Sequence, residues 1–356
     1  MVAASATGLL ISFPGRSNWL LGLLFTALAV FVLVWGLERY RTTFSKTELG
    51  VSLLVAAGLL VVAFAPGLVE TVSRVLNIED RFLVQIAANV VFVVLLLYLV
   101  GVTGANRGRI DELTCGVTAQ QAPEPEDTDE RSLYAVIPAY NEADSIGGVL
   151  DALPDSVEGY AVTPVVVSDG SADRTTQVAR GYDAIVVEHP INQGQGGSLK
   201  TGFRIALAHG ADIVVTMDAD GQHPPDQLPE LVAPVAADEA DYVLGSRYRG
   251  EDNSGNSVTR QGGIFAFTWL INRLAKTDIS DCTNGYRAIR GNRLRELTLV
   301  ESRFSAPELI IEARKNGLRI REVPITIRER EAGETKKPKL GYAYGLMRTI
   351  VVTWIR

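Results

Sequence analysis

Hydrophobic residues follow two different patterns along this chain. In the first hundred residues they form three long runs, 19–37, 50–69 and 82–102, which contain few charged positions. An apolar run of about 20 residues matches the length of a helix that crosses a bilayer. The pattern therefore predicts a transmembrane helical module over residues 1–103, with about three spans.

A polar segment, 104–131, follows the third run. It contains Pro123 and Pro125 among acidic and amide side chains, and low hydrophobicity combined with proline is typical of a solvated linker. We therefore expect an acidic linker between the apolar module and the rest of the chain.

Beyond this linker the apolar runs become short and alternate with segments of helical length. Short runs of aliphatic residues are expected to be buried strands, and they lie at 133–137, 164–167, 184–187, 213–217 and 242–244. Strands that alternate with helices predict an α/β domain with a mainly parallel sheet flanked by helices. We place this domain at 132–336 and expect its ligands beyond the carboxyl ends of the strands.

The last twenty residues, 337–356, form a basic and amphipathic tail. Lys337 and Lys339 precede tyrosines and aliphatic residues at helical spacing, a combination that is typical of a helix on a bilayer surface. Packing of the same apolar positions against the globular domain is the alternative.

Charge and composition exclude several classes of function. The 356 residues include 34 basic and 41 acidic side chains, a formal net charge of −7, which gives no general attraction to nucleic acid. Two cysteines, Cys115 and Cys282, cannot build a disulfide framework. The mean hydropathy of +0.15 averages an apolar first part and a water-soluble second part.

Basic residues beside the apolar runs predict the orientation in the membrane. Arg39, Arg41 and Lys46 follow the first run, and Arg107 and Arg109 follow the third. Placing both groups inside gives a multi-pass protein of the cell membrane with a cytoplasmic catalytic domain.

The sharpest chemical signal is Asp218-Ala219-Asp220, directly after a predicted strand. Two carboxylates at i and i+2 can both reach a divalent cation where the chain turns, and Mg²⁺ prefers one or two carboxylates together with phosphate oxygens. Gln222 lies two residues further on. A solvated turn is the alternative, because Asp and Gly are ordinary turn residues.

Polar residues also follow the first two strands of the domain. Pro138, Tyr140 and Glu142 follow the first strand, and Asp169 follows the second. An aromatic ring and carboxylates suit a nucleoside, although capping of the next helix would use similar residues.

Basic residues in two parts of the domain are further candidates for substrate binding. A glycine-rich stretch, 192–202, contains Lys200, but Leu199 stands where a P-loop requires glycine, so Lys200 faces either a nucleotide or solvent. Arg247 and Arg260 are candidates for phosphate contacts, because guanidinium binds phosphate in a bidentate manner.

Together, residues 133–336 resemble family 2 glycosyltransferases of the GT-A fold, specifically the synthases that join a hexose to polyprenyl or dolichyl phosphate. The motifs that carry the resemblance are 136–142, 169–175, 192–202, 218–225, 245–247, 281–287, 322–324 and 330–336. Ser168 and Thr335 depart from the family, which has Asp and Ser there. The resemblance implies a GT-A nucleotide-diphospho-sugar transferase fold, a GDP-mannose or UDP-glucose type of donor, a polyprenyl or dolichyl phosphate acceptor, and Mg²⁺ or Mn²⁺ as cofactor.

The resemblance also implies roles for individual residues. The nucleotide-sugar would be bound by Pro138, Tyr140, Glu142, Asp169, Lys200 and Asp218. The metal would be held by Asp218, Asp220 and Gln222. Arg247 would contact the donor phosphate, and the acceptor phosphate would be bound by Arg260, Arg330 and Lys336. The central catalytic residues would be Asp220, Arg247 and Arg260.

Physical chemistry favours the same acceptor. A phosphate monoester has a second pKa near 6 and is already ionised at neutral pH, so it needs no general base, whereas a sugar hydroxyl does. In-line displacement then inverts the anomeric configuration. The alternatives are transfer to a hydroxyl of a lipid-linked or surface glycan, a non-catalytic membrane subunit that binds nucleotide-sugar, and a nucleotidyltransferase.

Overall fold

A computed structural model describes residues 19–43, 46–64, 71, 74–75, 80–125, 130–253, 258–303, 305–328 and 339–356. The chain divides into two compact units, Met1–Ala105 and Asn106–Arg356, and each is described by itself.

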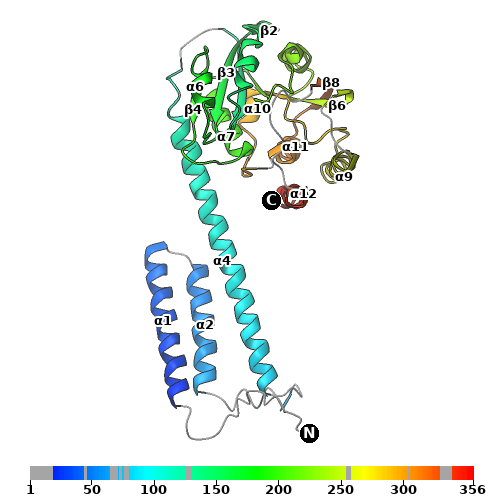
Figure 1. The fold of residues 1–356 in the computed structure, drawn as a ribbon. Coiled ribbons are helices and arrows are strands. Elements are labelled where there is room, and N and C mark those ends of the chain that lie inside the picture. The colour runs from blue at the N-terminus through cyan, green and yellow to red at the C-terminus, as the bar shows by residue number, and fades with distance from the viewer. Residues whose placement is uncertain are drawn as a thin grey trace, which may run out of the picture. The chain divides into compact units, whose positions relative to one another are not determined.

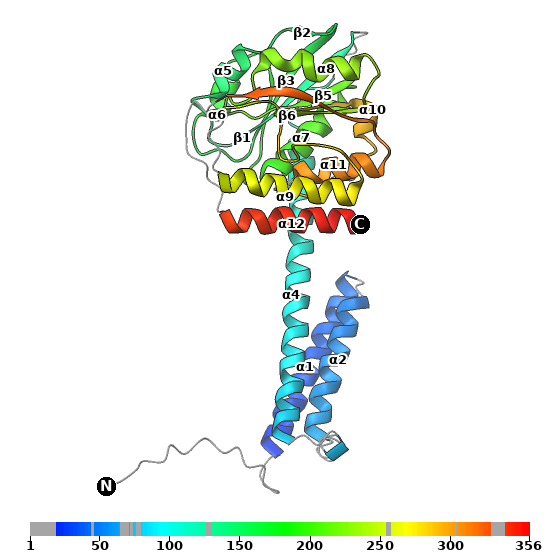
Figure 2. The same ribbon diagram turned by 90° about the vertical axis from the view of Figure 1, so that its right-hand side faces the viewer.

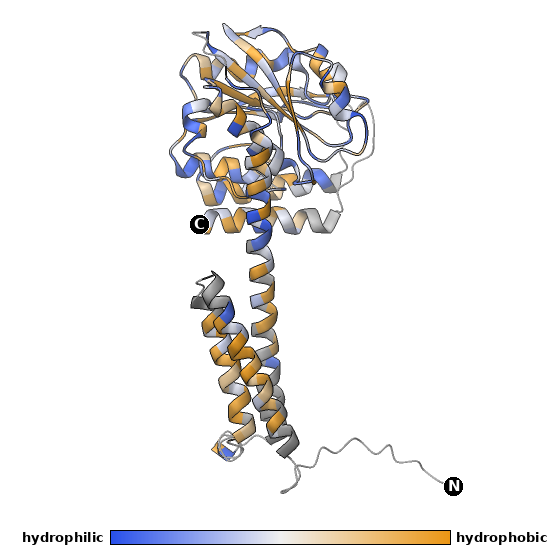
Figure 3. Cartoon of the chain, turned by 90° about the vertical axis from the view of Figure 1, so that its left-hand side faces the viewer, coloured by the Kyte–Doolittle hydropathy of each residue, from blue (hydrophilic) through white to orange (hydrophobic). Residues whose placement is uncertain are grey.

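The first unit is helical. It contains α1 (Trp19–Thr43), α2 (Lys46–Phe64) and the first part of α4 (Asp80–Ala119), and α1 packs against α2 (Figure 1). These helices are largely apolar (Figure 3), and exposed side chains include Leu23, Phe31, Leu54 and Phe92. No helix within the described ranges combines the length and hydropathy needed to cross a membrane, so the predicted spans are not confirmed.

The second unit is built on one mixed sheet. Its strands are β1 (Ser132–Ala139), β2 (Ser156–Val157), β3 (Tyr160–Ser168), β4 (Ile185–Glu188), β5 (Ile213–Thr216), β6 (Tyr242–Asp252), β7 (Arg287–Arg290) and β8 (Ile320–Ile327). They run in the order β2-β3-β1-β5-β7-β6-β8, with β4 also paired to β3. The pairs β1/β3, β1/β5, β3/β4 and β6/β8 are parallel.

Helices cover both faces of this sheet (Figure 2). The covering elements are α5 (Ile146–Asp151), α6 (Thr175–Ala179), α7 (Gln195–Ala208), a 3-10 turn η1 (Pro225–Gln227), α8 (Leu228–Ala236), α9 (Val258–Ala275), α10 (Gly291–Leu294), α11 (Ser305–Lys315) and α12 (Lys339–Ile355). Leu133 and Ile137 join a core with α5 and α8, whereas Val136 joins the opposite core with α7 and α11. Burial on both faces explains why the central strands read as continuous apolar runs. The predicted α/β class is confirmed.

Three strands were not visible in the sequence pattern. β7 is the most instructive, because it lies antiparallel between β5 and β6 although it begins and ends with arginine. Arg287 is only 1% exposed, and its guanidinium donates to the carbonyls of Asn284 and Ala306. Burial of an arginine requires such partners, which hydrophobic periodicity does not reveal.

The predicted linker over 104–131 is partly wrong. α4 continues to Ala119, and Cys115 and Thr118 are fully buried in the second unit. Asp111, Thr114, Cys115 and Thr118 share one helix face through spacings of three and four residues, so 106–119 pack on the catalytic domain as a helix.

The predicted amphipathic tail forms α12, which contacts α9 and α11. Leu346, Thr349, Ile350 and Thr353 are buried at helical spacing. The alternative of packing against the globular domain therefore holds for this face of the helix.

Close packing between α7 and β1 yields a stability prediction. A Cβ atom at Gly202 would lie 2.2 Å from Cγ1 of Val136, so Gly202→Ala should destabilise the domain by about 1–3 kcal/mol. Gly148→Ala is the matched control, because its Cβ would have no atom within 4 Å. Chemical denaturation of both variants measures the difference, and equal stability of the two would show that α7 has room to move.

Candidate active site

The strand order makes a topological switch point beside β1. β3 and β5 flank β1 and both run parallel to it. The chain continues from β1 to β3 on one side and later returns to β5 on the other side, so the strand order reverses at β1. Ligands of open α/β sheets bind at such switch points, outside the carboxyl ends of the strands. Pro138 lies at the end of β1, and the predicted residues at 140–142, 169 and 218–222 follow β1, β3 and β5.

The acidic turn after β5 is fixed by a buried histidine. The backbone N–H of Asp218 donates to Nδ1 of His223 over 2.9 Å, and Nε2 of His223 lies 3.0 Å from Oδ1 of Asn284. The imidazole also stacks on the Tyr286 ring at 4.9 Å between centroids. This packing sets the direction of the turn.

Asp218 itself lies at the open side of the turn. Its side chain is 34% exposed, and Oδ1 accepts a 2.9 Å hydrogen bond from the side-chain amide of Gln195. Gly285 lies directly beneath it, since a Cβ there would be 3.1 Å from Oδ1. The absent side chain leaves the space that the carboxylate occupies.

Asp220 and Gln222 complete the turn. Asp220 is 7% exposed and accepts the backbone N–H of Gln222 on Oδ1 over 3.1 Å. The side-chain amide of Gln222 donates to the carbonyl of Arg328. The two carboxylates suit a divalent cation through their negative charge, and Gln222 keeps its side-chain carbonyl oxygen as a further candidate ligand.

Within the described part of the chain, no group of three or more His, Cys, Asp or Glu side chains is placed to hold a metal ion. Two carboxylates on one turn still fit Mg²⁺ or Mn²⁺, whose remaining ligands in phosphate-transferring sites are substrate oxygens and water.

The turns after β1 and β3 are joined to each other. Asn141 adopts a positive φ of 54° and accepts the backbone N–H of Ala172 over 2.8 Å. The backbone N–H of Glu142 donates to Oγ1 of Thr175. Asn141 thus connects two loops, and α5 begins only at Ile146. Near this junction Pro138 is half-buried and Tyr140 is 41% exposed.

Asp169 has a different environment from the one expected of a nucleoside ligand. It is 3% exposed, Oδ1 accepts the N–H of Gln193, and Oδ2 accepts the N–H of Gly194. Its Oδ1 also lies 2.8 Å from Nδ1 of His189. In this arrangement Asp169 holds the glycine-rich loop, and its contact with a nucleoside stays a prediction.

His189 joins Asp169 to the end of α4. Although burial opposes it, the hydrogen bond and charge of Asp169 raise the pKa of His189 to about 9, with a further contribution from Cys115. Nε2 of His189 lies 2.8 Å from Oγ1 of Thr201. Burial raises the pKa of Cys115, but hydrogen bonds with His189 and Thr201 outweigh this and lower it.

Lys200 is not brought to the acidic turn. It is 9% exposed, and Nζ donates to the carbonyl of Val300 over 3.3 Å. This burial rules out a side chain in open solvent, and the contact of Lys200 with a nucleotide stays a prediction.

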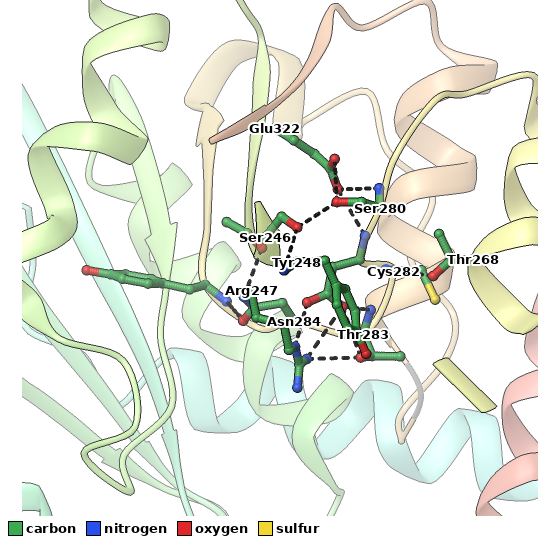
Figure 4. Close-up of polar contacts among 12 residues, drawn as sticks. Ser246, Arg247, Tyr248, Thr268, Ser280, Cys282, Thr283, Asn284 and Glu322 are labelled. Carbon is green, nitrogen blue, oxygen red and sulfur yellow. Dashed lines mark hydrogen bonds and ion pairs between the residues drawn. The ribbon is translucent and has the colours of Figure 1, made fainter. Parts of the chain in front are cut away.

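Arg247 lies in the middle of β6 and forms a buried ion pair (Figure 4). It is 8% exposed, Nε donates to Oδ2 of Asp281 over 2.6 Å, and Nη2 donates to Oγ1 of Thr283. Asp281 is fully buried and counteracts the desolvation of the guanidinium, so that the pKa of Arg247 is raised despite burial.

Glu322 closes the same cluster from β8. Its carboxylate accepts the backbone N–H groups of Ser280 and Asp281 and pairs with Arg249 at 3.0 Å. The loop that carries Asp281 is therefore held on both sides.

The roles of the remaining basic candidates stay predictions. Arg260 is exposed in the first turn of α9. Arg330 and Lys336, with the motif 330–336, lie outside the described residues.

Sequence reasoning missed the residues that orient the site, namely His189, His223, Asp281, Asn284 and Glu322. Four of these, His223, Asp281, Asn284 and Glu322, lie within motifs that carried the resemblance, whereas His189 lies in none of them. Position near a motif was the available signal, but the partner of each side chain depends on the tertiary fold.

An α/β sheet covered on both faces, with an acidic turn beside its switch point, agrees with the GT-A fold expected from the sequence. The model of the family described as Glycosyl transferase family 2 matches residues 134–298.

Known proteins agree with this class. The chain is 38% identical over 215 residues to the undecaprenyl-phosphate mannosyltransferase of Micrococcus luteus, covering 57% of this chain and 86% of that protein. It is 32% identical over 217 residues to the UDP-N-acetylglucosamine–dolichyl-phosphate N-acetylglucosaminyltransferase of Methanococcus voltae, covering 55% and 85%. The chain therefore belongs to glycosyltransferase family 2 and is a glycosyltransferase.

A solved structure shows the same fold. Glucosyl-3-phosphoglycerate synthase from Mycobacterium tuberculosis, in complex with Mn²⁺, uridine diphosphate and phosphoglyceric acid, aligns with a TM-score of 0.51 at 23% identity. The alignment covers 63% of this chain and 78% of that chain.

The environment of His189 predicts an unusual titration. Because its pKa is raised from 6.5 to about 9, the imidazole should stay protonated through pH 8 and lose its proton as the pH rises through about 9. Asp169→Asn removes the facing negative charge and should return the value toward 6.5. Nitrogen-15 NMR of the imidazole measures both. A wild-type His189 that titrates near 6.5 would contradict the assigned ion pair.

Proposed function

We propose that this glycosyltransferase moves a hexose from a nucleotide-sugar of the GDP-mannose or UDP-glucose type to polyprenyl or dolichyl phosphate, with inversion at the anomeric carbon. The reaction takes place at the cell membrane, with the catalytic domain in the cytoplasm. Two relatives that align over 85% and 86% of their length are named for dolichyl-phosphate and undecaprenyl-phosphate acceptors, which supports this class of acceptor.

The ion pair between Asp281 and Arg247 bears on the choice of acceptor, because a free carboxylate at this position could act as a base. A hydroxyl acceptor needs a general base within hydrogen-bond reach. Asp281 is fully buried and lies 2.6 Å from Nε of Arg247, so its charge is engaged in the ion pair. A phosphate monoester attacks without a base because it is already an anion.

The nucleotide-sugar donor and the phosphate acceptor are both anions, and basic side chains of this chain would bind them. Asp281 and Thr283 fix the guanidinium of Arg247 through Nε and Nη2, and Nη1 extends away from this cluster (Figure 4). We assign Arg247 to a substrate phosphate, and Arg260, Arg330 and Lys336 to the acceptor phosphate. Holding two anions at reacting distance offsets their repulsion.

Asp218 and Asp220 are the residues that would hold Mg²⁺ or Mn²⁺, with Gln222 nearby. When bound, the metal would neutralise charge on the departing nucleoside diphosphate. Tyr140 follows β1 and is 41% exposed. Its ring would stack on the nucleobase, and Pro138 and Glu142 lie beside it in the sequence.

Membrane contact is part of this proposal. α9 and α12 lie side by side under the sheet (Figure 2) and expose large apolar side chains, Phe265, Trp269, Tyr344 and Ile355, at 61–74%. Exposed apolar patches of this kind mark interaction surfaces, and a lipid surface suits an acceptor whose isoprenoid costs about 0.8 kcal/mol per CH₂ to remove from the bilayer. The exposed apolar helices of the first unit would contribute to the same attachment.

The acceptor is tested with purified full chain, Mn²⁺, undecaprenyl or dolichyl phosphate, and radiolabelled GDP-mannose or UDP-glucose. We expect a solvent-extractable product that carries one sugar and releases it in mild acid. Label that appears only in oligosaccharide would favour the hydroxyl acceptor instead. No transfer from a panel of nucleotide-sugars would favour the non-catalytic subunit.

The acidic turn is tested in the same assay. Asp220→Asn should lower turnover by at least about 100-fold, because it removes a charge that would hold the metal. Asp226→Asn is the matched control, since Asp226 lies close in sequence but its side chain is 69% exposed. Comparable activity of the two variants would remove the acidic turn from the reaction.

A further inference from the structure

The amino-terminal end of α7 borders the proposed donor site. Gln195, the first residue of α7, donates to Oδ1 of Asp218. Gly194 precedes it with a φ of 80° and donates its N–H to Oδ2 of Asp169. The position of this helix end therefore decides where Gln195 meets the acidic turn.

A short segment, Val300–Ser302, presses against that helix end. A Cβ atom at Gly196 would lie 2.5 Å from the carbonyl oxygen of Glu301, and one at Gly194 would lie 2.8 Å from that of Ser302. The N–H of Gly197 donates to the carbonyl of Ser302 over 3.0 Å, and this satisfies a first-turn donor that has no partner within the helix. A shift of the segment must therefore displace the start of α7.

Two elements hold the segment from its outer side. Oγ of Ser302 donates to Oδ2 of Asp111 on α4 over 2.7 Å, and Nη1 of Arg348 on α12 lies 2.8 Å from Oε1 of Glu301. Beneath them, the fully buried Glu308 of α11 accepts the backbone N–H groups of Val300 and Glu301.

We propose that Asp111 and Arg348 are positioning residues for the donor site. They act through the segment Val300–Ser302, which sets the start of α7 and thereby the contact of Gln195 with Asp218. This inference rests on the proposed function, because it assumes that the nucleotide binds beside the acidic turn.

The arrangement links the donor site to two helices that carry exposed apolar side chains. Arg348 lies between Met347 and Thr349 on α12, and Met347 is 44% exposed whereas Thr349 is buried. Asp111 lies on the part of α4 that packs on the catalytic unit. Neither residue touches the acidic turn itself, so each affects the donor only through the segment.

The test measures nucleotide affinity directly. Full-length chain is purified, and binding of UDP and of GDP in the presence of MnCl₂ is measured by calorimetry. Asp111→Ala and Arg348→Ala should each weaken binding of the preferred nucleotide by about three- to tenfold. In the transfer assay the donor KM should rise by a similar factor while the acceptor KM stays unchanged.

Matched variants separate positioning from general stability. Asp111→Asn keeps an oxygen acceptor for Ser302 and should restore affinity, as should Arg348→Lys in part. Arg321→Ala removes another exposed ion pair, the one with Glu239, and should leave affinity unchanged.

The outcomes are distinguishable. If wild type binds UDP or GDP but both alanine variants bind equally well, the positioning role is wrong while the proposed function stands. If the alanine variants lower the thermal midpoint and raise donor and acceptor KM alike, their role is only structural and the inference also fails. If wild type binds neither nucleotide, the proposed function itself fails.

Discussion

A hydrogen bond from the backbone of Asp218 to the imidazole of His223 fixes the acidic turn on which the proposed chemistry depends. Because Nδ1 accepts that bond, the imidazole proton lies on Nε2 and can be donated to Asn284. Asn284 in turn donates its amide to the carbonyl of Gly245, over 2.8 Å. One chain of hydrogen bonds therefore connects the turn after β5 to Gly245 within β6, two residues before Arg247.

Buried carboxylates in this protein mainly hold loops in place. Asp169 accepts two backbone N–H groups of the glycine-rich loop, Asp281 pairs with Arg247, and Glu322 holds the Asp281 loop. A buried charge is tolerated only when it is paired or hydrogen bonded, so these groups are committed to structure. An acceptor that brings its own negative charge suits such a site, because it demands no carboxylate base.

Much of the fold could be predicted from the sequence. Five of the strands, and the presence of helices between them, follow from apolar runs that both faces of the sheet bury, and the acidic turn follows a strand as expected. The antiparallel β7 could not be predicted, because the buried Arg287 needs hydrogen-bond partners that include Tyr242 and Ala306, which come from other segments of the chain. The helix over 106–119 was missed for a similar reason, since its buried face carries Cys115 and Thr118 rather than large aliphatic side chains.

The site was predicted less completely than the fold. Motifs located Asp218, Asp220 and Arg247, but composition could not show that Lys200 bonds to the carbonyl of Val300 or that both carboxylate oxygens of Asp169 are engaged. Such contacts depend on where neighbouring loops pass, and only the tertiary structure determines that.

The central claim is that the acceptor must be an anion, and a comparison of two lipids tests it most directly. Initial rates of sugar transfer are measured with undecaprenyl phosphate and with undecaprenol, which share the isoprenoid and differ in the phosphate. The account predicts transfer to the phosphate and none to the alcohol. Transfer to undecaprenol at a comparable rate would contradict it, because that reaction requires a base that Asp281 cannot provide.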